Sequence, residues 1–202
     1  MFSKIKNWLF HEDLKKQNLA AFIMLLGSGL GLLASFVLSI EALELAKNSH
    51  AVLSCDFSSA LSCSAVANHW SAAILEFPNS FIGMMTLPVM VTIAVALLAE
   101  AKFPKWFMQA TQAGAIIGMI FAIWMFYMSY VEIGVLCPWC LILDLGMLMI
   151  MFGLTRYNVL QKNISCRYMQ KIVVGGYDAL VVVSLVVAVI IAIIAKFGSQ
   201  LF

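Results

Sequence analysis

Five long apolar runs constrain this chain of 202 residues more than any other feature of its sequence. They lie at about residues 18–46, 80–100, 107–130, 136–155 and 172–196. Each run can cross the hydrocarbon core of a bilayer, which takes roughly 20 residues of helix. Backbone polar groups must be paired inside lipid, and the runs lack the alternation of barrel strands. The pattern therefore predicts an all-α integral membrane protein.

The composition agrees with this class and excludes others. Hydrophobic residues make up 63% of the chain and charged residues 11%, whereas soluble domains have roughly 45–50% and about 25%. The net charge is only +2 and the charges are scattered, so we expect membrane lipid and no nucleic acid as a partner. The first apolar run is too long for the core of a cleavable signal peptide, and we expect it to remain as the first span.

The basic residues predict the orientation, because cytoplasmic loops carry an excess of lysine and arginine. Ten of them fall on one side of the predicted topology: Lys4, Lys6, Lys15, Lys16, Lys102, Lys105, Arg156, Lys162, Arg167 and Lys171. Only Lys47 and Lys196 fall on the other side. We therefore expect the N-terminus inside, and the loop at 47–79 and the joint at 131–136 outside.

Two segments between or before the spans have patterns of their own. Residues 3–17 are amphipathic, and we expect them to lie along the membrane surface. The loop at 47–79 is about thirty residues long, and such loops are often functional. It contains apolar residues at helical spacing that we expect to form a half-helix on the membrane: Val66, Trp70, Ala73 and Ile74.

Four of the five cysteines form two pairs on the outer side of this topology, where disulfides persist. Cys55 and Cys63 lie in the long loop, and Cys137 and Cys140 form a C-P-W-C motif that opens the fourth span. Cys166 lies on the cytoplasmic side. Proline at the first helical position places the motif at a helix N-terminus. Free N–H groups and the helix dipole stabilise a thiolate there, which favours a redox-active pair.

Other interpretations of the cysteines remain open. The C-P-W-C pair can serve as small buried apolar residues, and the loop pair can form a structural disulfide. A zinc site with His50 or His69 is disfavoured, because seven residues between Cys55 and Cys63 make poor zinc spacing. We predict no metal, and we expect Cys166 to be an inert thiol.

Two redox pairs on one face of a membrane suggest a relay. Exchange passes through a mixed disulfide, so a loop pair can carry electrons from a soluble protein to a pair fixed at a helix end. The electrons then need an acceptor that is reachable from the bilayer. The sequence has no haem signature and no nucleotide-binding motif, so a lipid-soluble quinone is the simplest candidate.

Over roughly residues 18–155, the sequence resembles the vitamin K epoxide reductase family, specifically its bacterial homologues. The resemblance rests on Cys55-Asp56, Leu61-Ser62-Cys63-Ser64, Trp70, Asn79-Ser80-Phe81-Ile82-Gly83 and Cys137-Pro138-Trp139-Cys140. It implies a four-helix transmembrane bundle around a quinone, capped by the outer loop and half-helix, with a fifth helix added. We expect a cytoplasmic segment at 1–17, the catalytic core at 18–156, and a cytoplasmic loop with the fifth span at 157–202.

The resemblance also implies an activity and a place for it. Bacterial members oxidise a thioredoxin-like partner outside the cytoplasmic (inner) membrane and reduce a quinone, here ubiquinone or menaquinone. By position, Cys55 exchanges with the partner, Cys63 passes electrons to Cys137, and Cys140 faces the quinone. Asn79 matches the family's asparagine near the quinone, and it is equally open to a role as the N-cap of the second span.

Several further residues are candidates on chemical grounds. Asp144 lies one turn deeper than the C-P-W-C motif, and a carboxylic acid inside a span is a functional hypothesis by default. It can relay protons to the quinone or form a structural hydrogen bond. Trp139 is a further candidate for quinone contact. Glu41, Glu44 and Asp178 lie near span ends, where we expect structural charges that reach water.

The sequence departs from its relatives in two places. Many bacterial members carry a fused thioredoxin-like domain, whereas this chain ends at Phe202, so we expect a separate, DsbA-like partner. Near 68–70 the spacing is one residue shorter than in animal members, and their pocket serine has no assigned counterpart. The rival functions are a DsbB-like oxidase, a vitamin K epoxide or quinone reductase of animal type, and a non-enzymatic membrane protein (a transporter or an assembly factor) with structural cysteines.

Overall fold

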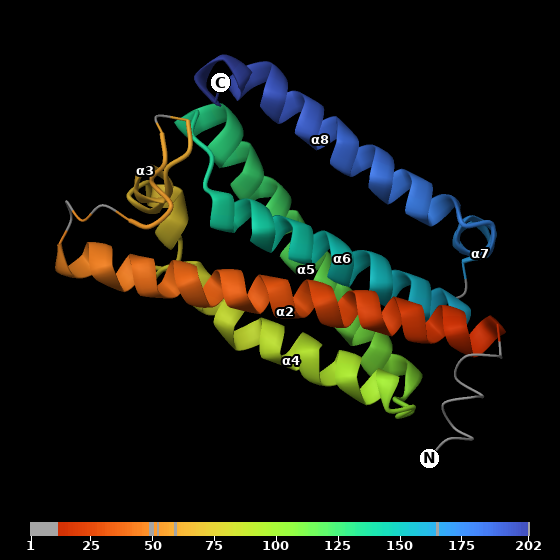
Figure 1. Cartoon of the computed structure of the whole chain (residues 1–202). Coiled ribbons are helices and arrows are strands. Elements are labelled where there is room, and N and C mark those ends of the chain that lie inside the picture. The colour runs from red at the N-terminus through yellow and green to blue at the C-terminus, as the bar shows by residue number, and fades with distance from the viewer. Residues whose placement is uncertain (1–11, 49–50, 52, 59, 165, 202) are drawn as a thin grey trace, which may run out of the picture.

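The computed structural model describes residues 12–48, 51, 53–58, 60–164 and 166–201, and most of them are helical (Figure 1). Five helices are long and apolar enough to span a membrane: α2 (Glu12–Lys47), α4 (Ser80–Leu98), α5 (Lys105–Tyr127), α6 (Pro138–Leu160) and α8 (Tyr177–Leu201). The shorter helices are α3 (Cys63–Ala67), η1 (Trp70–Ala73), η2 (Met128–Ile133) and α7 (Arg167–Val174). The predicted all-α membrane fold with five spans is confirmed.

Three boundaries differ from the expected ones. The amphipathic stretch at 3–17 lies mostly outside the described residues, and its last part, 12–17, belongs to α2. The predicted half-helix is two short pieces, α3 and η1, which Asn68 and His69 separate. The fifth span begins at Tyr177 and not at 172, because Gly176 adopts a φ of 74° between α7 and α8. Glycine enters that left-handed region without steric cost.

The four-helix bundle is built around α2, which packs against α6 and α4, while α5 packs against α6. Glycines bring α2 and α6 into close contact. A Cβ atom added at Gly146 would lie 2.7 Å from the Gly27 carbonyl oxygen, and one at Gly153 would lie 2.5 Å from that of Ala20. Small residues hold transmembrane helices together in this way, because lipid removes the hydrophobic driving force between them.

The fifth span, α8, lies at the edge of the bundle and leaves most of its surface exposed (Figure 1). Polar contacts attach it at both ends. Arg156 on α6 pairs with Asp178 at 2.7 Å, and the Tyr130 hydroxyl donates to the Ala192 carbonyl oxygen at 3.1 Å. Asp178 thus has the structural role that the sequence predicts.

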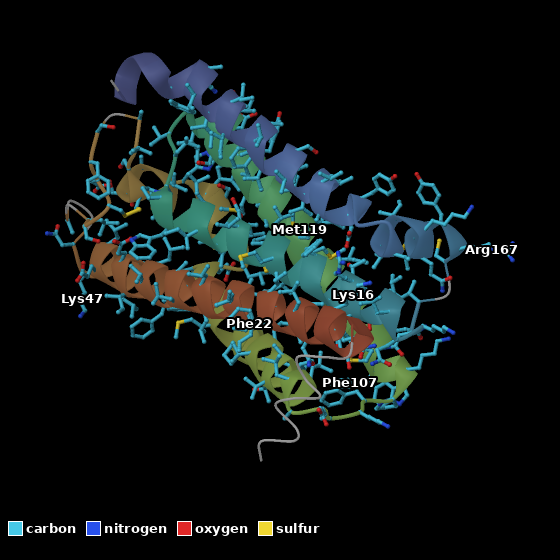
Figure 2. All side chains as sticks on the ribbon, turned by 45° about the vertical axis from the view of Figure 1, so that its right-hand side comes forward. Lys16, Phe22, Lys47, Phe107, Met119 and Arg167 are labelled. Carbon is cyan, nitrogen blue, oxygen red and sulfur yellow. A yellow bond between two sulfur atoms is a disulfide. The ribbon has the colours of Figure 1, made fainter. Side chains whose placement is uncertain are left out.

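The two ends of the bundle differ in character. One end carries the C-terminus of α2 and the N-termini of α4 and α6. It also carries residues 51–79 between α2 and α4, which we call the α2–α4 loop. Figure 2 shows Lys47 at this end and Lys16 and Arg167 at the opposite one. Both cysteine pairs therefore belong to the end that carries the α2–α4 loop.

Candidate active site

The C-P-W-C motif opens α6 as its sequence predicts. Cys137 is the N-cap residue in extended conformation, and Pro138 is the first helical residue. The backbone N–H of Cys140 donates to Cys137 Sγ at 3.2 Å. This bond brings one of the free N–H groups of the helix N-terminus to the sulfur as a hydrogen-bond donor.

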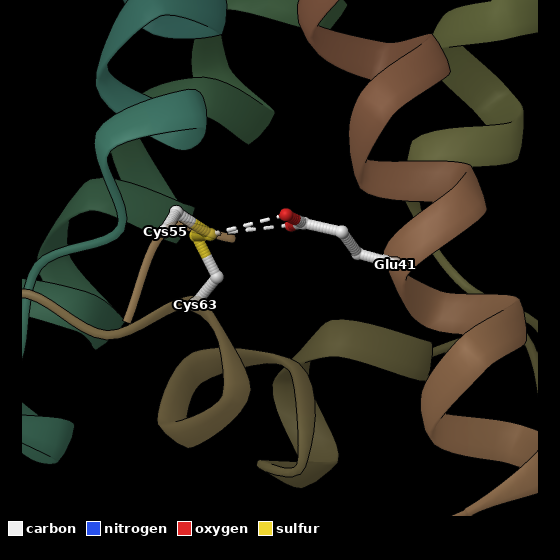
Figure 3. Close-up of side chains that lie close together, drawn as sticks. All are labelled: Glu41, Cys55 and Cys63. Atoms are coloured by element: carbon white, nitrogen blue, oxygen red, sulfur yellow. Dashed lines mark hydrogen bonds between the residues drawn. A yellow bond between two sulfur atoms is a disulfide. The ribbon is translucent and has the colours of Figure 1, made fainter. Parts of the chain in front are cut away.

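The loop cysteines form a disulfide, Cys55–Cys63, with a Cα–Cα distance of 5.7 Å (Figure 3). Both residues are buried, and Cys63 is the first residue of α3. Cys137 and Cys140 are both free thiols. The described state therefore has one oxidised pair and one reduced pair.

A short backbone pairing joins the α2–α4 loop to the segment before α6. Leu61 and Leu136 form an isolated parallel bridge, in which the Leu136 N–H donates to Ala60 O at 2.9 Å and the Ser62 N–H donates to Leu136 O at 3.0 Å. Leu136 immediately precedes Cys137, and Leu61 lies two residues before Cys63. The pairing therefore fixes the position of one cysteine pair relative to the other.

The result of this pairing is a direct contact between the two redox pairs. Cys63 Sγ lies 3.3 Å from Cys137 Sγ, and both residues are about 1% exposed. The two sulfurs lie in one buried apolar cluster, formed by Leu45, Leu53, Cys55, Cys63, Val66 and Cys137. A thiolate on either side can attack the other sulfur with little movement.

Asp56 organises the loop around the disulfide. Its carboxylate accepts hydrogen bonds from the Leu53 N–H at 2.9 Å, the Ser62 hydroxyl at 2.7 Å and the Ser64 N–H at 3.1 Å. Burial raises the pKa of Asp56, but these hydrogen bonds outweigh it and bring the pKa down to about 2. Asp56 is therefore ionised at neutral pH and ties both cysteine-bearing parts of the loop together.

Glu41 on α2 is the functional candidate that the sequence analysis missed. The expectation that this side chain reaches water is wrong, because the α2–α4 loop folds over it and leaves it 5% exposed. Its Oε2 and Oε1 atoms lie 3.2 Å and 3.4 Å from Cys55 Sγ (Figure 3). The signal was present in the sequence, since an acidic residue among the apolar residues of a span is itself a functional hypothesis.

The three candidate quinone residues have different surroundings. A narrow pocket beside the C-P-W-C motif is lined by Val66, Met125, Phe126, Ser129, Cys137, Cys140, Leu141 and Asp144. Of the three candidates, Asp144 lines this pocket together with Cys140. Trp139 instead packs against the buried cysteine cluster. The cavity has room for about one water molecule, so a quinone ring enters only if side chains move, but the mainly apolar lining with one thiol pair and one carboxyl group matches the chemistry of a quinone and its need for protons.

Asn79 holds the loop and does not cap α4 with its side chain, although it occupies the N-cap position. Its Nδ2 donates to Ser71 O at 2.6 Å, and its Oδ1 accepts from the Ile74 N–H at 3.3 Å. Nδ2 also approaches Met125 Sδ at 3.7 Å. The amide thus fixes η1 beside a residue that lines the pocket.

Metal ligation finds little support at the described residues. Donor atoms of Glu41, Cys55 and Cys63 lie within 4.8 Å of one another, but the two sulfurs are bonded to each other and offer no thiolate. His69 is engaged elsewhere, with its Nδ1 at 2.8 Å from Ser71 Oγ. His50 lies outside the described residues, and Cys166 is exposed at the start of α7.

A multi-pass helical bundle with two cysteine pairs in sulfur contact at one end is built as a membrane thiol–disulfide oxidoreductase. Comparison with known families agrees: the model of the vitamin K epoxide reductase family matches residues 22–156, and the chain belongs to this family. No curated protein matches the chain. The match includes all four cysteines of the two pairs, and the family is one of quinone-linked oxidoreductases.

Proposed function

We propose that this protein forms disulfides in a separate thioredoxin-like protein outside the cytoplasm and passes the electrons to a membrane quinone. The observation that carries the proposal is the distance of 3.3 Å between Cys63 Sγ and Cys137 Sγ. This contact gives electrons a route from a loop pair to a pair at a helix end. A purely structural disulfide has no need of it.

The partner reacts first with the loop pair. A thiolate of the reduced partner attacks Cys55 Sγ, the S–S bond to Cys63 breaks, and Cys63 leaves as a thiolate. The second thiol of the partner then attacks the partner sulfur that is bonded to Cys55. The partner leaves with a disulfide, and Cys55 is released as a thiol. Cys55 is the partner-facing cysteine, because its neighbours Ser54 and Phe57 are exposed while Cys63 faces Cys137.

The second exchange moves the electrons inward. The Cys63 thiolate attacks Cys137 of a Cys137–Cys140 disulfide, and Cys140 leaves as a thiolate. Cys55 then attacks Cys63, which restores the loop disulfide and releases Cys137. The products of this step, a loop disulfide and two thiols at α6, are the species that the structure describes.

The last step regenerates the disulfide at α6. Cys140 and Asp144 line the pocket that would hold the quinone, which would accept two electrons and two protons when bound. Cys137 and Cys140 release those electrons as their sulfurs bond. Asp144 lies on the wall of the same pocket, where its carboxyl group would hold and deliver a proton.

Charge and topology support the placement in a bacterial cytoplasmic membrane. The basic side chains of the loops that join α4 to α5 and α6 to α7 lie at the end opposite the cysteines, and such residues favour the cytoplasmic side. We therefore place the N-terminus inside and the α2–α4 loop outside. The core is residues 18–156, flanked by a cytoplasmic segment at 1–17 and by a loop and fifth span at 157–202.

The test uses the purified full chain with a reduced thioredoxin-like protein and either ubiquinone-1 or a soluble menaquinone analogue. Partner oxidation should depend on quinone in the wild type and should fall to background when any of Cys55, Cys63, Cys137 or Cys140 becomes alanine. Cys166→Ala is the matched control and should keep full activity. Absence of quinone-dependent turnover in the wild type would refute the proposal.

A further inference from the structure

Glu41 is a buried carboxyl group placed against the disulfide that meets the partner. Its polar neighbours in the described part of the chain are Ser54, whose hydroxyl donates to Oε1 at 2.7 Å, and Cys55 Sγ, at 3.2 Å from Oε2. Burying a carboxyl group in an apolar environment is costly. Because Glu41 lies against Cys55 Sγ, a sulfur that reacts in the relay, its carboxyl group is placed to take part in the reaction.

We infer that Glu41 is a catalytic residue of the loop pair, which accepts the thiol proton of Cys55 when Cys55 attacks and returns a proton when Cys55 leaves. This inference rests on the proposed relay, in which Cys55 alternates between nucleophile and leaving group. General acid–base groups must lie within hydrogen-bond reach of the proton they transfer. The distance from Glu41 Oε2 to Cys55 Sγ meets that condition, allowing for the larger radius of sulfur.

One geometry serves both redox states of Cys55. In the disulfide, Cys55 Sγ has no proton, so the hydrogen atom of this contact belongs to the carboxyl group, which donates it to sulfur. In the reduced pair the thiol donates to the carboxylate. When Cys55 leaves its mixed disulfide with the partner, the electron pair of that S–S bond goes to Cys55 Sγ and the proton moves from Oε2 to Sγ. When Cys55 later attacks Cys63, the proton returns to Oε2, the Cys55–Cys63 bond forms, and the electron pair of the Cys63–Cys137 bond goes to Cys137.

Burial makes this internal proton exchange necessary. Cys55 is 2% exposed and Glu41 is 5% exposed, so bulk water reaches neither group while the loop is closed. The other titratable groups that act on this site are Asp56 of the loop, Glu44 of the same helix and Cys140 of α6. Asp56 is saturated by three hydrogen-bond donors of its own loop, which leaves Glu41 as the group in contact with Cys55.

The experiment compares Glu41→Gln with the wild type, using purified full-length protein, dithiothreitol as the dithiol and ubiquinone-1 as the acceptor. Glutamine keeps the shape and the acceptor for Ser54 but cannot take a proton. Positioned acids and bases contribute roughly 10²–10⁴-fold to rates, and we expect a loss of at least about tenfold at pH 7. The ratio of the wild-type rate to the variant's rate should fall as pH rises towards the thiol pKa, because Cys55 then loses its proton to solvent without Glu41, whereas the ionisation of dithiothreitol affects both proteins alike.

Two variants serve as controls. Glu44→Gln removes an exposed carboxylate from the same helix that acts on Glu41 only through its charge, and it should keep most of the neutral-pH rate that Glu41→Gln loses. Glu41→Asp keeps the acid on a shorter side chain and should restore part of the neutral-pH rate. A Glu41→Gln variant that matches the wild type at every pH would overturn the inference.

A second measurement separates this inference from the relay. In a background with Cys137→Ala and Cys140→Ala, reduction of the loop disulfide by dithiothreitol is followed by alkylation and a gel shift, without quinone. Here Glu41→Gln should slow the release of Cys55 from its mixed disulfide with dithiothreitol by about tenfold or more at pH 7, since Cys55 then leaves without a proton donor. If wild-type turnover with quinone is absent, the relay fails, and equal reduction rates in this background would independently refute the role of Glu41.

Discussion

A single methyl group at Gly146 should force α2 and α6 apart. A Cβ atom there would lie 2.7 Å from Gly27 O and 3.0 Å from Gly31 N, so it would approach backbone about 0.7 Å closer than the 3.4 Å at which ordinary contact begins. Backbone cannot rotate away as a side chain can. Overpacking of this kind costs about 1–3 kcal/mol, so we expect Gly146→Ala to lower the free energy of unfolding by that order.

The matched control is Gly29→Ala on α2, where an added Cβ atom meets nothing within 4 Å. Alanine is favoured over glycine in a helix by roughly 0.5–1 kcal/mol, so this variant should be as stable as the wild type or more stable. Both are measured by titration with sodium dodecyl sulfate in mixed micelles, with circular dichroism as the signal. Equal unfolding midpoints for Gly146→Ala and Gly29→Ala would refute the close packing of α2 on α6.

Three further outcomes follow from the site. The double variant Cys55→Ala, Cys140→Ala should form a Cys63–Cys137 disulfide on exposure to oxidant, visible in a peptide map under non-reducing conditions, because these two sulfurs lie 3.3 Å apart and both thiols that could resolve their bond are gone; a map in which Cys63 and Cys137 stay free thiols would argue against the contact. Asp56 has a pKa of about 2 in place of the ordinary 3.8, so its stabilisation of the loop is complete above that ordinary value and is lost as pH falls towards 2. Proteolysis of the loop should increase over that range in the wild type but not in Asp56→Asn, and identical profiles would contradict this. Asp144→Asn should slow quinone reduction by about 10²-fold while dithiothreitol still reduces the loop disulfide at the wild-type rate; slowing of both reactions would contradict a role at the pocket alone.

The features that the sequence predicts well are those set by local chemistry. Runs of apolar residues can cross a bilayer only as helices, so the five spans follow directly. Pro138 allows only a helix start at the C-P-W-C motif, and the structure has α6 begin there. Gly176, by contrast, adopts a left-handed conformation that the spacing of apolar residues does not predict. The fifth span therefore begins at Tyr177, five residues after the predicted start at 172.

The features that the sequence does not predict depend on contacts between segments far apart in the chain. Nothing in the residues around Leu61 indicates that they pair with Leu136, since an isolated bridge has no strand pattern. Glu41 looks like a charge near a helix end until the α2–α4 loop covers it. Asn79 has the residue type and position of a helix cap, but a competing bond to Ser71 O takes its side chain into the loop.

The bridge between Leu61 and Leu136 has a consequence for the timing of electron flow. Both sulfurs of the loop disulfide are buried, so we expect an incoming protein to reach Cys55 only after the residues around Leu61 move away from Leu136, while the Ser54–Glu41 hydrogen bond keeps Cys55 beside Glu41. That movement breaks two backbone hydrogen bonds, at a net cost of about 1 kcal/mol each, and it withdraws Cys63 from Cys137. We therefore expect the loop pair to react with the partner and with Cys137 in turn, and not with both at once. A small reductant in solution would then react with the loop pair only when the loop is open. In that position the loop pair cannot exchange with the cysteines of α6.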